Sequence, residues 1–145
     1  MGSSNHLHLA LGAISQSTEL ETSDDVVFLD SAASDHYIRN REWLFDYILV
    51  SGEKPVLGVE AGRSMEIAGR GSIDCTFQVE PNKFHAIQID NIPHVPKFSS
   101  NLLSVGRLER NGMRVIFENG KATVWSGDIK VMVATRQGTM YPIHM

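Results

Sequence analysis

Short segments with a two-residue apolar repeat, separated by turn-forming residues, constrain the fold of this chain more than any other feature. In residues 71–79, four apolar side chains alternate with polar ones, and residues 85–92 repeat the pattern. Such alternation is typical of a strand with one buried face. Residues 27–29, Val-Phe-Leu, form an unbroken apolar run that predicts a buried strand. These segments together predict a mainly β fold.

Turn residues predict two further β units. Residues 61–63, Ala-Gly-Arg, separate two short segments at 55–60 and 64–69 and so predict a hairpin. Nearer the C-terminus, Asn119-Gly120 is a strong hairpin turn, because both residue types tolerate a positive φ. The segments that follow predict a β-meander at residues 122–125 and 129–134, closed by residues 140–143.

One α-helix is predicted, at residues 101–111. Ser99, Ser100 and Asn101 offer side-chain oxygens that can cap its first turn. The apolar residues that follow have helical spacing, and Gly112 can end the helix in the left-handed conformation. The predicted fold class is therefore all-β with one short helix.

Length and composition predict one compact domain preceded by a leader. The 145 residues are 42% hydrophobic and 21% charged, which is ordinary for a soluble domain. Residues 1–25 show no sustained periodicity and are predicted to be a flexible leader or linker. The core is expected to span residues 26–117. Residues 118–145 are expected to form a C-terminal β-hairpin extension, with the alternative that they belong to the core itself.

Composition also argues against several classes of partner. The chain has 13 basic and 17 acidic residues, a net charge of −4, and no basic cluster interleaved with aromatic residues, so no nucleic-acid surface is predicted. No apolar run approaches the roughly 20 residues that a membrane helix needs. The single cysteine, Cys75, cannot form an internal disulfide. The histidines and Cys75 lack the spacing of a metal site, so neither a metal nor a cofactor is expected.

The apolar run at residues 27–29 ends in a carboxylate, Asp30, which is followed by the very small residues Ser31, Ala32 and Ala33. The small residues predict a turn, so Asp30 is expected at a strand end, partly shielded from water. A carboxylate presented in this way is suited to chemistry. The alternative is a turn carboxylate that bonds only to backbone amides, with Ser31 as a locally bonded hydroxyl.

Ser34, Asp35 and His36 contain the residue types of a Ser-His-Asp triad. Neighbours in sequence point in different directions, so these three residues are not expected to act as one. For Asp35 and His36 we expect a surface position or a supporting role behind the site.

Asp30-Ser31-Ala32 resembles the Asp-Thr/Ser-Gly signature of aspartic proteases, and it lies within residues 29–36, Leu-Asp-Ser-Ala-Ala-Ser-Asp-His. The wider match is to the protease of copia-type LTR retrotransposons, which usually has Leu-Asp-Ser-Gly-Ala-Ser/Thr followed shortly by His. Residues 92–108 and 112–117 are similar to the Val-Pro, Asn-Leu-Leu-Ser-Val and Gly-x-x-Val-x-Phe segments of that family. The similar segments run in the family's order from Val27 to Tyr141.

The resemblance implies a retropepsin-like fold, which is a closed β-barrel with a flap hairpin. It also implies a homodimeric aspartic endopeptidase that processes its own Gag-Pol polyprotein in the cytoplasm, within virus-like particles. The catalytic residue would be Asp30 of each chain, acting on an activated water. The active-site loop would contain Ser31, Ala32 and Ala33. The flap tip that covers the polypeptide substrate would be Ala61, Gly62 and Arg63.

One position departs from the family pattern, because Ala32 stands where glycine is usual. With a negative φ, alanine adds only a methyl group near the substrate backbone, whereas a positive φ costs about 1 kcal/mol and distorts the loop. Two alternatives therefore stand beside the active protease. One is a weak or inactive retropepsin-like β-domain that serves dimerisation or peptide binding, and the other is a domesticated retropepsin of a host protein.

Overall fold

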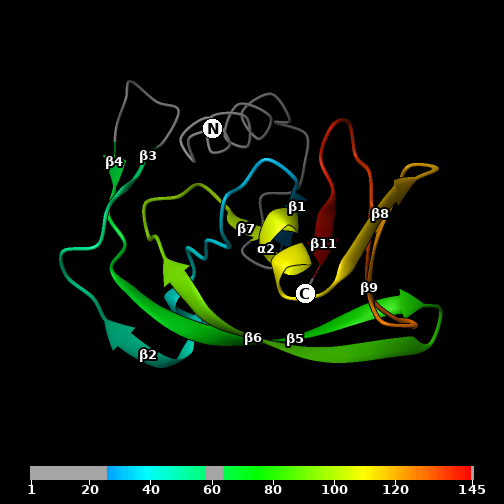
Figure 1. Ribbon diagram of the computed structural model, residues 1–145, viewed down its shortest axis with the longest axis horizontal. Helices are drawn as coiled ribbons and strands as arrows, with labels where there is room; N and C mark the ends of the chain where they lie inside the picture. The colour runs from blue at the N-terminus through cyan, green and yellow to red at the C-terminus, as the bar shows by residue number, and fades with distance from the viewer. Residues whose placement is uncertain (1–25, 58–63, 145) are drawn as a thin grey trace.

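The computed structural model describes residues 26–57 and 64–144 (Figure 1). Over these ranges the chain is mainly β-strand, with one short helix, α2 (Val105–Arg110), and one turn of 3-10 helix, η1 (Arg41–Trp43). The strands are β1 (Val26–Asp30), β2 (Phe45–Leu49), β3 (Val56–Leu57), β4 (Ser64–Met65), β5 (Gly69–Glu80), β6 (Lys83–His94), β7 (Asn101–Ser104), β8 (Arg114–Glu118), β9 (Lys121–Ser126), β10 (Ile129–Thr135) and β11 (Pro142–His144). The predicted fold class is confirmed as a mainly β, barrel-like domain. The predicted leader, residues 1–25, and the predicted flap tip, residues 61–63, lie outside the described residues.

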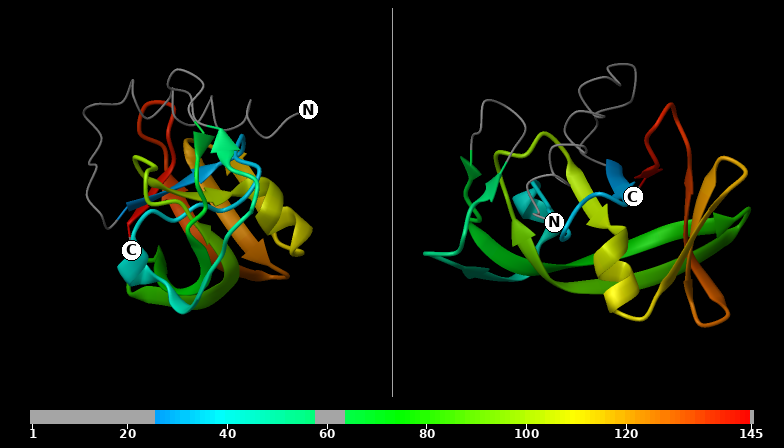
Figure 2. Two further views of the ribbon diagram at one scale, coloured as in Figure 1. Left: turned by 90° about the vertical axis from the view of Figure 1, so that its left-hand side faces the viewer. Right: turned by 45° about the horizontal axis from the view of Figure 1, so that its top comes forward.

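The longest unit is the antiparallel hairpin of β5 and β6, which curves along one side of the molecule (Figures 1 and 2). From Ile73 to Glu80 the side chains of β5 are alternately buried and exposed, so the predicted two-residue repeat is confirmed. β2 pairs with the other edge of β5. This curved sheet forms one wall of the barrel-like domain.

β1 lies at the centre of another sheet, antiparallel to β11 and parallel to β7. Val27 and Leu29 belong to the main hydrophobic cluster, whereas Val26 and Phe28 belong to a second cluster on the opposite face. A strand covered on both faces needs a continuous apolar sequence, which the Val-Val-Phe-Leu run provides. The strand that ends in Asp30 is therefore held on both faces and at both edges.

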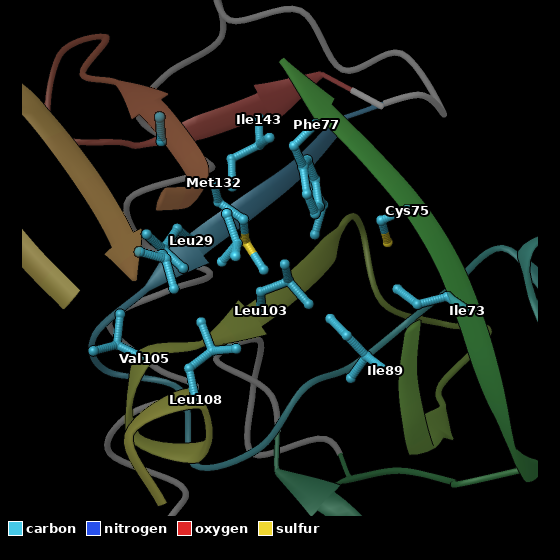
Figure 3. Close-up of a cluster of buried hydrophobic side chains, with 14 of the residues drawn as sticks. Leu29, Ile73, Cys75, Phe77, Ile89, Leu103, Val105, Leu108, Met132 and Ile143 are labelled. Atoms are coloured by element: carbon cyan, nitrogen blue, oxygen red, sulfur yellow. The ribbon is translucent and has the colours of Figure 1, made fainter. Parts of the chain in front are cut away.

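The main hydrophobic cluster joins residues from early and late parts of the chain (Figure 3). The members labelled in Figure 3 come from β1, β5, β6, β7, α2, β10 and β11: Leu29, Ile73, Cys75, Phe77, Ile89, Leu103, Val105, Leu108, Met132 and Ile143. Ala122 and Val124 of β9 belong to the same cluster. Residues 118–144 thus share a core with the segment that precedes them.

The predicted β-meander is confirmed as the sheet β8–β9–β10. Its first turn has a positive φ at Asn119 (54°) and at Gly120 (74°), as the Asn-Gly sequence predicts. The prediction that residues 140–143 close this meander is wrong, because β11 pairs with β1 instead. This pairing completes the central sheet and buries Ile143 in the main cluster.

The prediction of a helix over residues 101–111 is wrong in its first turn. Residues 101–104 form β7, all four of them are buried, and they pair in parallel with β1. Only residues 105–110 are helical, and the cap is Ser104 rather than Ser99, Ser100 or Asn101. The apolar spacing of this segment fits a helix, but a strand buries Leu102 and Leu103 on opposite faces of the central sheet. Gly112 ends the helix with a φ of 90°, as predicted.

Candidate active site

Asp30 is the last residue of β1 and is half-buried. Strand alternation places it on the face of β1 that carries Val26 and Phe28. The second hydrophobic cluster covers this face and includes Val56 of β3, with Met65 of β4 packed against it. The Asp30 side chain and the arm formed by β3 and β4 thus lie on the same face of the central sheet.

The Asp30 carboxylate organises the turn that follows it. Its Oδ1 accepts a hydrogen bond from the backbone N–H of Ala32 at 2.8 Å. Ser31 is exposed, whereas Ala33 is buried. A short-range bond of this kind is typical of an aspartate that begins a turn. It ties one oxygen of the carboxylate to the turn at the end of β1.

Ala32 occupies its position without backbone strain. Among the described residues, the non-glycine residues with a positive φ are Asp46, Asn82, Asn91 and Asn119. Ala32 is therefore not in the left-handed region. Of the two cases considered for this residue, the one without a positive φ holds, in which alanine does not distort the loop. At such a φ the alanine side chain adds only a methyl group to the turn.

Ser104 joins residues 31–36, which follow Asp30 and are called the Asp30 loop below, to the start of α2. The parallel register of β1 and β7 sets Ser104 opposite Asp30. Ser104 is fully buried, and its backbone N–H donates to Nδ1 of His36 at 2.8 Å. Its hydroxyl donates to the carbonyl oxygen of Ala33 at 2.7 Å and accepts from the N–H of Arg107 at 3.1 Å. One serine thus caps the helix and holds both ends of residues 33–36.

The two residues between Ala33 and His36 are also held by α2. Arg107 donates to Oδ1 of Asp35 at 2.8 Å, and Arg110 donates to the carbonyl oxygen of Ser34 at 3.1 Å. Four consecutive residues of the loop therefore each bond to the segment 104–110. Because the ion pair and the Arg110 bond are partly or fully exposed, we expect them to contribute less than the buried bonds of Ser104.

His36 is the most deeply buried polar side chain of this loop, with 0% of its surface exposed. The expected surface position is therefore wrong for His36, and the alternative of a supporting role agrees with its contact to Ser104. Burial and the nearby guanidinium groups of Arg107 and Arg110 lower the pKa of His36 to about 3. The imidazole is thus neutral near pH 7, with Nδ1 as the acceptor and the proton on Nε2.

Asn101 braces the chain at the other end of β7. Its side-chain oxygen accepts hydrogen bonds from the N–H groups of Arg39 at 2.8 Å and Asn40 at 3.4 Å, and its amide nitrogen donates to Val26. The sequence pattern predicted Asn101 only as a helix cap and predicted no role for Ser104, although both lie in the Asn-Leu-Leu-Ser-Val segment. Buried polar residues at the two ends of an apolar run were the signal that could have found them.

The base of the predicted hairpin at residues 55–69 is present, because Val56 pairs with Met65 and Leu57 with Ser64. Glu53, which precedes this arm, accepts two hydrogen bonds of 2.9 Å from Arg70 of β5. These bonds lower the pKa of the Glu53 carboxyl. The segment that leads into the arm is thus anchored to β5 of the curved sheet.

Three further observations concern parts of residues 26–57 and 64–144 outside the Asp30 loop. No group of three or more His, Cys, Asp or Glu side chains within these ranges could hold a metal ion. None of the helices described there is long and apolar enough to cross a membrane. A cavity of about 230 Å³ lies between the ends of the β5–β6 and β9–β10 hairpins, and no residue of the Asp30 loop lines it.

Comparisons with known proteins identify the family. No curated protein and no solved structure matches the chain. A comparison with family models matches residues 27–113 to the family described as "Pol polyprotein, beta-barrel domain". This match covers more than half of the chain and includes β1 from Val27 onward, the Asp30 loop, β7 and α2. The chain therefore belongs to the family of Pol polyprotein beta-barrel domains, and it is a domain of a retroelement Pol region.

Proposed function

We propose that this domain is the homodimeric aspartic endopeptidase of a copia-type LTR retrotransposon, and that it processes its own Gag-Pol polyprotein. The observation that carries the proposal is the placement of Asp30. This carboxylate stands at the end of a strand covered on both faces, in a turn closed by Ala32, and its loop is tied to α2 through Ser104. A loop held in this way supports a carboxylate at one fixed position, and a catalytic group must be held in its productive geometry.

The reaction needs two carboxylates about 3 Å apart that share one proton. The ionised carboxylate takes a proton from water as the water attacks the amide carbonyl, and the protonated carboxylate donates to the carbonyl oxygen. One chain supplies one Asp30, so the second comes from another copy related by a two-fold axis. Ser31 is exposed in the single chain, which leaves its hydroxyl available to bond across such an interface.

The substrate in this proposal is an extended polypeptide that lies between the Asp30 loop and the β3–β4 arm. Val56 and Met65 place apolar surface of the arm next to the face of β1 that carries Asp30. Ala61, Gly62 and Arg63 would form the part of the arm that covers the peptide. The proposed location is the cytoplasm, within virus-like particles, and no cofactor is needed because the dyad itself activates the water.

A mixing experiment tests both the catalytic residue and the dimer. The Gag-Pol precursor is incubated with the wild-type domain, with Asp30→Asn, and with equal amounts of both after exchange of subunits. Asp30→Asn alone is expected to be inactive. At equal total protein concentration, the mixture retains about a quarter of the wild-type activity if both carboxylates are needed, whereas independent monomers would retain about half.

Cleavage measured over a series of dilutions of the wild-type domain provides a second test of the dimer. A dissociating dimer loses activity more steeply than in proportion to concentration. Cleavage by Asp30→Asn at the wild-type rate would refute the proposal. A domain that binds precursor without cutting it would support the alternative, a catalytically inactive module for dimerisation or peptide binding.

A further inference from the structure

Within the part of the chain that the structure describes, His36 carries a polar side-chain atom without a hydrogen-bond partner. The side chain is fully buried, and its Nε2 finds no acceptor among the described residues. Burying an unpaired N–H group costs free energy, and an apolar residue of similar size would avoid that cost. We therefore expect the other ring nitrogen, Nδ1, to make an interaction that offsets the cost of burying Nε2.

That other nitrogen makes a specific contact. Nδ1 of His36 accepts the backbone N–H of Ser104 at 2.8 Å, and Ser104 lies opposite Asp30 in the β1–β7 register. The hydroxyl of the same serine holds the carbonyl oxygen of Ala33. The two bonds close a ring that links the loop after Asp30, the end of β7 and the first turn of α2.

We propose that His36 is a positioning residue of the protease site, whose unprotonated Nδ1 holds the Ser104 amide and thereby fixes where the Asp30 loop places its carboxylate. This inference rests on the proposed function. In a symmetric dyad, a displacement of the loop moves both carboxylates at once. A misplacement of about 1 Å in an active site can lower the rate about 100-fold, so the loop needs a rigid support.

Two substitutions separate positioning from simple filling of the core. His36→Leu fills the space and removes the acceptor, whereas His36→Asn keeps an acceptor oxygen near the position of Nδ1. Val124→Ala, a buried residue of β9 in the main cluster, serves as the control for general loss of stability. For the wild type and these three variants, kcat and KM of precursor cleavage are measured at a temperature at which each protein is folded.

We expect His36→Leu to lower kcat about 10- to 100-fold with KM within about threefold, and His36→Asn to recover most of the loss. Val124→Ala is expected to keep the wild-type kcat. An unchanged kcat in His36→Leu, or an equal loss in Val124→Ala, would overturn the inference. If the Asp30→Asn variant cleaves the precursor at the wild-type rate, the proposed function itself is overturned.

Hydrogen exchange tests the inference without reference to activity. The amide of Ala32 bonds to the Asp30 carboxylate, so its exchange rate reports on the position of that carboxylate. His36→Leu is expected to raise the exchange rates of the Ala32 and Ser104 amides at least about tenfold, while amides of β9 and β10 keep their rates. His36→Asn is expected to restore protection. Equal protection of Ala32 in wild type and His36→Leu would show that His36 does not position the loop.

Discussion

Replacement of Ser104 by alanine tests the buried contacts that hold the Asp30 loop. The substitution keeps the backbone N–H that bonds to His36 and removes only the hydroxyl. The Ala33 carbonyl then loses its donor inside the protein, and the Arg107 N–H loses its cap. Both effects act on the folded state alone.

The size of the effect follows from these two bonds. Loss of a serine N-cap costs about 1 kcal/mol. An unsatisfied buried acceptor adds about 1–3 kcal/mol. The sum is about 3 kcal/mol, and for a domain of this length each kcal/mol lowers Tm by about 4 °C. We therefore expect Ser104→Ala to lower Tm by about 12 °C.

Circular dichroism during heating and in urea measures this loss. Protein concentration must be equal in all samples, because a dimer makes Tm depend on concentration. Ser126→Ala, at an exposed residue at the end of β9, is the matched control and is expected to change stability by less than about 0.5 kcal/mol. If Ser104→Ala loses no more stability than Ser126→Ala, the hydroxyl bonds do not hold the loop.

Two further predictions concern the same loop. The pKa of His36 is about 3 in the folded chain against 6.5 for an ordinary histidine, so between these values the unfolded chain binds a proton that the folded chain excludes. His36 follows Asp35 and faces Arg107 and Arg110 of α2. The contribution of neutral His36 to the free energy of unfolding is complete above pH 6.5, and it falls by about 2 kcal/mol between pH 7 and pH 5. Urea unfolding should show this slope in the wild type and a smaller one in His36→Asn, and equal slopes would contradict the assignment. Ala32→Gly is expected to lower stability by about 0.4–1 kcal/mol and to leave the cleavage rate within about threefold, because Ala32 already has an unstrained φ; a large gain in activity would show that the methyl group obstructs the substrate.

The local features of this domain could be predicted because neighbouring residues determine them. The alternation in β5 reports one buried face, and Asn119-Gly120 reports a turn that needs positive φ. The position of Asp30 at a strand end also follows from the apolar run before it and the small residues after it. In each case the deciding interactions lie within a few residues of the pattern.

Features that depend on distant pairing could not be predicted in this way. The apolar pattern of residues 101–104 fits both a helix and a short buried strand. Only the parallel pairing with β1 decides that these residues form a strand. The same applies to β11, whose partner is the first described strand rather than the preceding meander.

The amino-acid sequence alone determined that this chain is a mainly β domain with a carboxylate at the end of a buried strand. Only the tertiary structure decided what holds that carboxylate in place. Asn101 bonds to Val26, a residue 75 positions away, and Ser104 brings together Ala33, His36 and Arg107. The burial of His36, whose Nε2 has no partner among residues 26–57 and 64–144, is likewise a product of the tertiary structure, because a histidine in a turn sequence has no intrinsic preference for burial.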